Sequence, residues 1–313
     1  MKEAKILLGD HKSNYVNVGL GLFTFIDNSQ VLQQVLGPES EAVPKAIWLF
    51  GDNIIDSMKQ VRKYRSGLYV IGQVSSIKQA SELKDAGIDA VVIQGTDAGG
   101  HGAAVSASII SLIPEARDKL GEDFTIIAAG GVGDGRAVAA ALCLGSDLVC
   151  MGTAFAIAEE SLMKPGGKER ICMTTDGGKN TVRYEIIKIK KKKKKKKKNI
   201  YIYIYIYILT CHHSLTIFRT RVYDDLRGTA KYWTNDFNGR GLKNKSFQEY
   251  LDSVPMQEMQ TAFKQGSEKE DVDYLVVFAG TSSGLCKRIE PAKDIVSRIT
   301  QQAVSVLKNQ QVE

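Results

Sequence analysis

Residues 90–102 read AVVIQGTDAGGHG, and in this segment an apolar run changes abruptly to a glycine-rich one. The first four residues are an apolar run of the kind that forms a buried strand. Four of the next nine are glycine, which costs too much backbone entropy for the interior of a strand or helix. The segment therefore predicts a buried strand that ends in a loop, where the backbone comes close to another group and His101 lies at the tip.

Five further apolar runs resemble the first and also predict strands. With 90–93 included, the predicted strand cores are 16–22, 46–50, 68–74, 90–93, 125–129 and 148–151. Helical patterns lie between them: Ser76 and Gln79 form a capping box before one, and Asp134 can cap another. Strands that alternate with helices predict a parallel sheet with both faces covered.

Polar residues and glycines gather where these strands end. They are Gly72-Gln73 within the third strand, Gln94-Gly95 after the fourth, Gly130-Gly131 after the fifth and Gly152-Thr153 after the sixth. In parallel α/β folds the ligand lies at the carboxyl ends of the strands. Contacts from many consecutive strands favour a barrel over a doubly wound sheet, so the predicted fold class is a (β/α)8 TIM barrel.

The last two glycine-bearing strand ends lie just before predicted helix starts. This matches the phosphate site that such a barrel builds after its strands 7 and 8. Counting back from that site makes the six runs strands 3–8, so we expect an incomplete barrel without strands 1 and 2. Helical patterns over 247–263 and 291–307 predict a C-terminal helical subdomain that packs over the mouth of the barrel.

A low-complexity tract divides the chain. Residues 190–198 are an unbroken lysine run, and residues 201–208 alternate Tyr and Ile. AAA codons and a TATATA repeat would encode both, so we interpret 184–219 as a translated intron, with a lysine-rich surface loop as the alternative. The expected domains are a partial barrel over 1–183, the insert over 184–219, and a C-terminal helical lid region over 220–313.

The net charge of +7 belongs to that tract. The tract contains ten lysines, Arg219 and one acid, Glu185, and so contributes +10, which leaves −3 for the rest of the chain. We therefore expect no nucleic-acid partner. The cysteines show no CxxC spacing, and Cys211-His212-His213 lies inside the tract, so neither a disulfide framework nor a metal site is expected.

The overall composition is that of a globular protein, with 43% hydrophobic and 25% charged residues. No segment has the long apolar core of a signal peptide or the length of an uncharged membrane span. We therefore expect a cytoplasmic protein without a membrane partner. The sequence does not set the oligomeric state.

Three motifs follow one another in order at the predicted strand ends: VVIQGTDAGGH at 91–101, AAGGV at 128–132 and CMGTAF at 150–155. This set closely resembles the nitronate monooxygenase family, formerly called 2-nitropropane dioxygenases, and its details are most similar to fungal members. The resemblance extends to AIWLF at 46–50 and FAGT at 278–281. It implies an FMN-dependent enzyme that oxidises alkyl nitronates with O2 to carbonyl compounds and nitrite.

The same resemblance implies roles for individual residues. His101 matches the histidine that acts as base toward neutral nitroalkanes and faces the substrate. Gly131 matches the glycine whose amide binds the phosphate, and Cys150 departs from the usual Gln of the family. The cofactor-binding residues that the resemblance and the strand ends imply are Gln73, Gln94, Gly99, Gly100, Gly130, Gly131, Cys150, Met151, Gly152 and Thr153.

Other interpretations stay open. The glycines could form only a tight turn, His101 could bond to loop backbone, and Cys150 could be redox-active or simply packed. The chain could be a truncated, non-catalytic barrel that is poorly soluble and cannot hold flavin, because family members take contacts from the first two strands. It could also be an FMN-dependent enoyl reductase or another reductase on the same fold, which would consume NAD(P)H.

Overall fold

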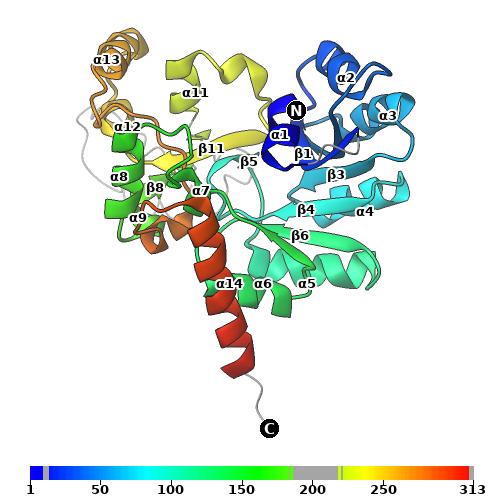
Figure 1. Ribbon diagram of the computed structural model, residues 1–313. Coiled ribbons are helices and arrows are strands. Elements are labelled where there is room, and N and C mark those ends of the chain that lie inside the picture. The colour runs from blue at the N-terminus through cyan, green and yellow to red at the C-terminus, as the bar shows by residue number, and fades with distance from the viewer. Residues whose placement is uncertain (10–13, 183, 186–217, 220, 310–313) are drawn as a thin grey trace, which may run out of the picture.

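The structure is a computed structural model that describes residues 1–9, 14–182, 184–185, 218–219 and 221–309. Its centre is a six-stranded parallel sheet with the strand order β1-β2-β3-β4-β6-β7 (Figure 1). The strands are β1 (Tyr15–Phe23), β2 (Val43–Phe50), β3 (Tyr69–Val74), β4 (Ala90–Gln94), β6 (Thr125–Ala129) and β7 (Leu148–Cys150). All six predicted strands are confirmed, with differences of a few residues at their ends.

Helices connect successive strands and lie along the outer side of the sheet (Figure 1). They are α2 (Ser29–Leu36), α3 (Ile54–Tyr64), α4 (Ile77–Asp85), α5 (Ile109–Leu120) and α6 (Gly135–Cys143). The predicted caps are present: Ser76 Oγ accepts the N–H of Gln79 at 3.3 Å, and Asp134 accepts the N–H of Arg136 at 3.0 Å. Side-chain caps therefore mark the start of α4 and of α6, as predicted.

Apolar side chains of the central strands divide between the two faces of the sheet. Successive residues in a strand point to opposite faces. The outward-facing set packs against the helices and includes Val91, Ile93, Ile126 and Ala128. The inward-facing set is a separate cluster of Val92, Ile127 and Ala129, with Trp48, Ile71 and Cys150 packed against it. This second cluster forms an apolar floor below the carboxyl ends of the strands.

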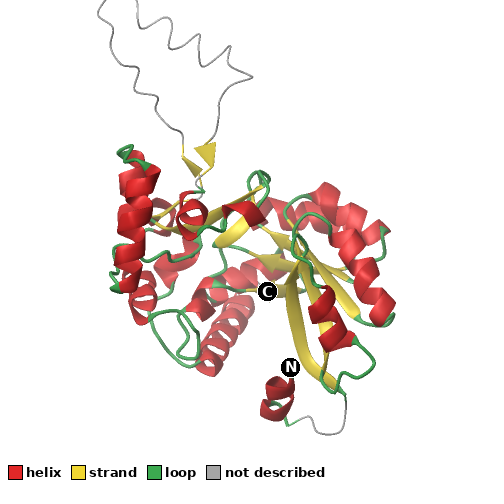
Figure 2. Cartoon of the chain, turned by 90° about the horizontal axis from the view of Figure 1, so that it is seen from above, coloured by secondary structure: helices red, strands yellow, loops and turns green. Residues whose placement is uncertain are grey.

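The sheet curls into a half-barrel that does not close (Figure 2). Among the described strands, β1 pairs only with β2, and β7 pairs only with β6. The side chain of Phe23 at the end of β1 is 44% exposed and contacts Trp233 edge-on, with a centroid separation of 5.5 Å. The C-terminal part of the chain therefore covers some of the open edge with aromatic rings.

The remaining elements include two small antiparallel sheets, β10-β9 and β5-β11-β8, and mainly short helices. They are α1 (Lys2–Leu7), β5 (Gly100–Ala103), α7 (Thr153–Ala156), α8 (Pro165–Met173), α9 (Gly177–Asn180), β8 (Thr181–Val182), β9 (Tyr184–Glu185), β10 (Phe218–Arg219), α11 (Val222–Arg227), η1 (Ala230–Tyr232), β11 (Phe237–Leu242), α12 (Lys245–Leu251), α13 (Met256–Glu268), η2 (Thr281–Leu285) and α14 (Ala292–Asn309). The helical patterns predicted over 247–263 and 291–307 correspond to α12, α13 and α14.

The C-terminal part closes over the carboxyl ends of the strands. The N–H of Gly280 donates to Thr153 Oγ1 at 3.0 Å, and the N–H of Thr281 donates to the Asp97 carbonyl at 3.0 Å. A Cβ on Gly99 would lie 2.4 Å from the Ala279 carbonyl carbon, so this glycine allows the two backbones to touch. The loop after β4 is therefore held against a segment some 180 residues away in the chain.

The predicted insert lies largely outside the described residues, which omit 186–217. At its two ends, β9 pairs antiparallel with β10, and Arg219 lies opposite Tyr184. Neighbouring strands are about 5 Å apart, so the tract leaves and rejoins the fold at almost the same point.

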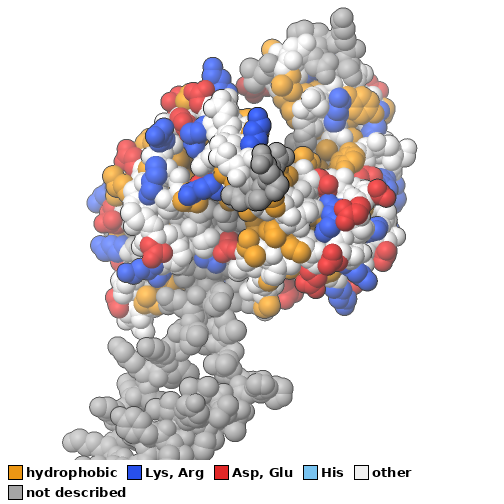
Figure 3. Space-filling view, turned by 90° about the horizontal axis from the view of Figure 1, so that it is seen from below, with side chains coloured by type: hydrophobic (Ala, Val, Ile, Leu, Met, Phe, Trp, Pro, Cys, Tyr) orange, Lys and Arg blue, Asp and Glu red, His pale blue; other side chains and the backbone are white. Residues whose placement is uncertain are grey.

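Cationic and anionic side chains are mixed over the face of the molecule that Figure 3 shows. Of the helices that the structure describes, none is long and apolar enough to cross a membrane. The described residues also contain no group of three or more His, Cys, Asp or Glu side chains placed to hold a metal ion. The trio Cys211-His212-His213 lies outside those residues.

Candidate active site

A cavity of about 310 Å³ lies at the carboxyl ends of the parallel strands. Small-molecule sites are typically concavities of roughly 300–1,000 Å³. Its walls come from consecutive strands and from the C-terminal segment that covers them. The lining residues are Trp48, Gln73, Gln94, Ala98, Gly99, Gly100, Ala129, Gly130, Gly131, Val132, Cys150, Gly152, Thr153, Ala156, Phe278, Gly280 and Ser282.

The cavity brings together nine of the ten residues predicted to bind a cofactor. Met151 is the exception, because it packs against the two larger apolar clusters instead. It directly follows Cys150, which lines the cavity, so the alternation of side chains along an extended backbone turns it the other way. The side chain of Met151 therefore points away from the cavity, and a cofactor contact from this residue stays a prediction.

The glycines of the site serve two purposes: some adopt a backbone conformation that other residues avoid, and others leave space in the cavity. Gly130 and Gly131 have φ values of 103° and 78°, a left-handed conformation that suits glycine. A Cβ on Gly100 or Gly152 would meet no atom within 4 Å, although both residues line the cavity. The absence of side chains at these last two positions therefore keeps the space open.

Two glutamines supply polar groups to the cavity. Gln73 Oε1 accepts a hydrogen bond from the indole N–H of Trp48 at 2.9 Å, which fixes its amide group. Gln94 Nε2 donates to the His101 carbonyl at 3.0 Å, and Gln94 itself is 6% exposed. Within the described part of the chain, Gln94 Oε1 is a buried acceptor without a hydrogen-bond donor. Such an atom is costly unless a ligand supplies the donor.

Residues of the cavity wall also carry backbone donors that are unpaired in the part of the chain that the structure describes. No described residue accepts a hydrogen bond from the N–H of Gly131, Gly152 or Thr153. The last two belong to the start of α7, where first-turn N–H groups have no partner within the helix. The start of α6, by contrast, is occupied, because Asp134 caps it and Gln302 Oε1 accepts the N–H of Gly135 at 2.8 Å. Of the two helix starts predicted to hold a phosphate, only that of α7 is free of protein caps.

His101 lies beside the cavity rather than in its wall. It was predicted at the tip of a loop, but it belongs to β5, where it pairs with Gly239 of β11. Its imidazole stacks on Trp233 with a centroid separation of 3.8 Å, and it lies 5.2 Å from the ring of Phe278, which does line the cavity. Its Nε2 lies 2.9 Å from Asp224 Oδ1. The imidazole therefore lies next to a residue of the cavity wall, Phe278, without itself lining the cavity.

Cys150 is a partly buried thiol at the end of β7. Burial raises the pKa of this thiol above its ordinary value, which keeps it protonated at neutral pH. A protonated thiol is a poor nucleophile. The packed interpretation of Cys150 therefore fits the structure better than the redox-active one.

Four aromatic or charged side chains of the site were not predicted from the sequence. Trp48, Asp224, Trp233 and Phe278 line the cavity or surround the imidazole. Asp224 lies in the first turn of α11, where an acidic residue ordinarily needs no explanation beyond the helix dipole. Trp48 could have been found from the sequence. Its indole N–H lies within an otherwise apolar strand and needs an acceptor, and Gln73 in the next strand supplies one.

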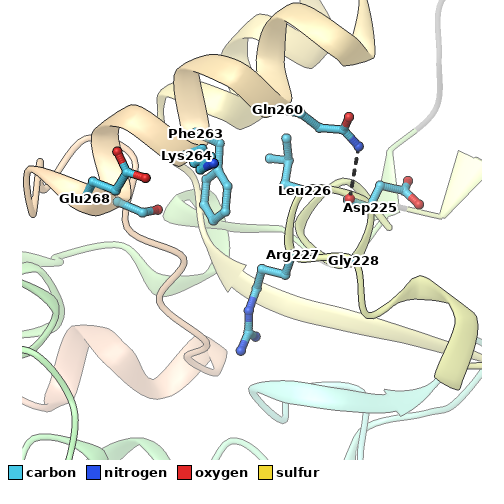
Figure 4. A pocket seen from close by; sticks show the side chains of 9 residues that line it. Asp225, Leu226, Arg227, Gly228, Gln260, Phe263, Lys264 and Glu268 are labelled. Atoms are coloured by element: carbon cyan, nitrogen blue, oxygen red, sulfur yellow. Dashed lines mark hydrogen bonds between the residues drawn. The ribbon is translucent and has the colours of Figure 1, made fainter.

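A larger groove of about 710 Å³ lies between α11 and α13 (Figure 4). Leu226 and Phe263 supply apolar surface, while Arg227, Lys264 and Glu268 supply charges of both signs. None of the predicted site residues lines it. The strand-end cavity is the better candidate site, because it combines an unsatisfied buried acceptor, free backbone donors and open glycine positions.

The fold and the cavity together define a parallel α/β protein with a candidate small-molecule site at the carboxyl ends of its strands. Residues 22–186 match the family model described as nitronate monooxygenase. A nitronate monooxygenase of Neurospora crassa is 31% identical over 310 residues, covering 94% of this chain and 72% of that protein. Nitronate monooxygenase npaC of Metarhizium robertsii is 28% identical and covers 93% and 74% respectively.

Solved structures support the same fold. FabK from Thermotoga maritima superposes with a TM-score of 0.66 at 20% identity, covering 97% of this chain and 81% of that one. At this identity the similarity concerns the fold alone. The family match and the Neurospora crassa relative together establish that the chain belongs to the nitronate monooxygenase family. The resemblance seen in the three sequence motifs, including its fungal character, is confirmed.

Proposed function

We propose that the strand-end cavity binds FMN and that the protein oxidises alkyl nitronates with O2, giving carbonyl compounds and nitrite. The observation that carries this proposal is the convergence of nine predicted residues on one cavity that also contains an unsatisfied acceptor. Gln94 Oε1 suits an isoalloxazine N–H, and the open positions at Gly100 and Gly152 leave room for a flat ring. The residues present therefore fit FMN.

The phosphate of FMN would be held by the free N–H groups of Gly131, Gly152 and Thr153. Backbone amides at a helix start suit an anion, because they bring partial positive charge without bulk. Gln73 and Gln94 would orient the ring, and the apolar floor of Val92, Ile127 and Ala129 would exclude water beneath it. Bound FMN supplies the redox chemistry between nitronate and O2.

The six strands correspond in this proposal to strands 3–8 of a (β/α)8 barrel, with residues 220–313 as a lid region. Two features support the correspondence: the half-barrel is open along β1, and the candidate phosphate donors follow its last two strands. Strands 7 and 8 are followed by the phosphate site in barrels of this type.

An activity assay distinguishes the proposal from its alternatives. The FMN-loaded protein, mixed with an alkyl nitronate in air, should consume O2 and release nitrite without any nicotinamide. A reductase on the same fold would instead oxidise NAD(P)H anaerobically and leave the nitronate unchanged. That result would overturn the proposed reaction while leaving FMN binding in place.

We also propose that residues 184–219 are a translated intron. Removing them also deletes β9 and β10, but should leave the rest of the fold intact, because Tyr184 and Arg219 lie opposite each other at the two ends of the tract and a shorter connection costs less closure entropy. We expect the deletion variant to stay soluble, with a Tm within a few degrees of the full chain and unchanged FMN affinity, measured by thermal melting and fluorescence titration. An insoluble or FMN-free variant, or a messenger RNA that contains these codons, would contradict the intron interpretation.

A further inference from the structure

We infer that Asp224 is a positioning residue for His101: its carboxylate fixes the imidazole as the tautomer with the proton on Nε2 and leaves Nδ1 to exchange a proton with substrate. The inference deepens the proposed function and rests on it for the identity of the substrate. Its structural basis is independent of that function. Nε2 lies 2.9 Å from Oδ1 and 3.1 Å from Oδ2 of Asp224.

The carboxylate needs this hydrogen bond. The side chain of Asp224 is 2% exposed, and a buried carboxylate is costly unless donors surround it. One donor is the hydroxyl of Thr229, which lies 3.0 Å from Oδ1. The other is the Nε2–H of His101. An ionised carboxylate only accepts hydrogen bonds, so the pair favours the tautomer in which Nε2 carries the hydrogen.

The ring has little freedom to turn over. Trp233 stacks on one face at an interplanar angle of 5°, and Phe278 lies against it at 55°. On the side of β11, a Cβ at position 239 would lie 3.5 Å from Nε2, so Gly239 lets the backbone pass close to the imidazole. The stack and the close backbone hold the ring in the orientation in which Nε2 meets Asp224.

Nδ1 is then the nitrogen left for chemistry. None of the described residues forms a hydrogen bond with it. In the deprotonation of a neutral nitroalkane, the C–H bond next to the nitro group breaks and its proton goes to Nδ1. The electron pair of that bond moves into the nitro group, which gives the nitronate anion. The imidazolium that forms keeps its charge-assisted hydrogen bond to the carboxylate of Asp224.

The test combines the tautomer of His101 with the kinetics of Asp224→Asn. In the wild-type protein, ¹⁵N NMR of labelled imidazole should show the proton on Nε2. The asparagine variant can present its own N–H to Nε2, so the proton should move to Nδ1. With Nδ1 blocked, kcat for a neutral nitroalkane should fall about 10²–10⁴-fold, the usual contribution of a positioned base. Oxidation of a preformed nitronate should change by less than about tenfold, because it needs no deprotonation.

Asp225→Asn is the matched control, because this neighbouring residue is exposed and does not contact the imidazole. It should leave the tautomer and both activities unchanged. A wild-type imidazole with its proton on Nδ1 would overturn the inference, and this measurement does not depend on whether Asp224→Asn folds. A folded Asp224→Asn variant with full nitroalkane activity would also overturn it. If the wild-type protein oxidises no nitronate, the proposed function fails, while the tautomer measurement still tests the pairing.

Discussion

Replacing Gly152 by leucine should weaken FMN binding by about five- to 150-fold without unfolding the protein. Gly152 has φ of −102° and ψ of −63°, which other residues adopt without strain, and a Cβ there would meet no atom within 4 Å. The protein can therefore accept the side chain. The added carbons would instead project into the cavity, where overfilling costs about 1–3 kcal/mol.

The measurement is a fluorescence titration of FMN against wild type and variant, with thermal melting to report the fold. Gly67→Leu is the matched control, because Gly67 also has no atom within 4 Å of a built Cβ but is not among the residues that line the cavity. We expect the control to bind FMN as wild type does. Equal FMN affinity in Gly152→Leu and wild type would place the cofactor elsewhere.

Replacing His101 by glutamine should lower kcat for a neutral nitroalkane by about 10²–10⁴-fold and largely spare oxidation of the corresponding nitronate. Glutamine can donate an N–H to Asp224, so the buried carboxylate keeps a donor and the fold is retained. It cannot, however, accept a proton from carbon. The loss should therefore appear only with the substrate that must first be deprotonated.

The two substrates are compared in steady-state assays on FMN-loaded protein, with the flavin content of each preparation measured from its absorbance. A variant that loses both activities in equal proportion would give His101 a role in cofactor binding or folding instead. A variant that retains nitroalkane activity would remove it from the reaction altogether.

The strands and their carboxyl ends could be predicted because their signals are local. An apolar run such as 90–93 and a glycine pair such as Gly130-Gly131 identify a strand and its end without any knowledge of its neighbours. Parallel strands then bring their carboxyl ends to one edge of the sheet. This is why residues from 73 to 153 could be assigned to one cavity before any contact was known.

The surroundings of His101 could not be predicted in the same way. Asp224 lies 123 residues further along the chain, and β5 exists only because β11 pairs with it. No periodicity in 94–102 indicates such a partner, so the glycine content alone pointed to a loop. The loop prediction was wrong for residues 100–102, which belong to β5, because tertiary pairing overrode the weak strand propensity of glycine.

The side chain of Met151 points away from the cavity for another reason, the alternation of side chains along an extended segment. It was assigned to the site because a contiguous motif was carried over as a whole, whereas the side chains of an extended segment alternate. The same rule correctly places Gln94 and Cys150 at the cavity.

The most direct test of the account is the visible spectrum of the purified wild-type chain after incubation with FMN and gel filtration. A cavity that is already complete predicts bound flavin at about one molecule per chain, with perturbed absorption bands that Gly152→Leu loses. Soluble, folded protein that emerges without flavin would contradict the account, and would favour a barrel fragment that cannot hold the cofactor.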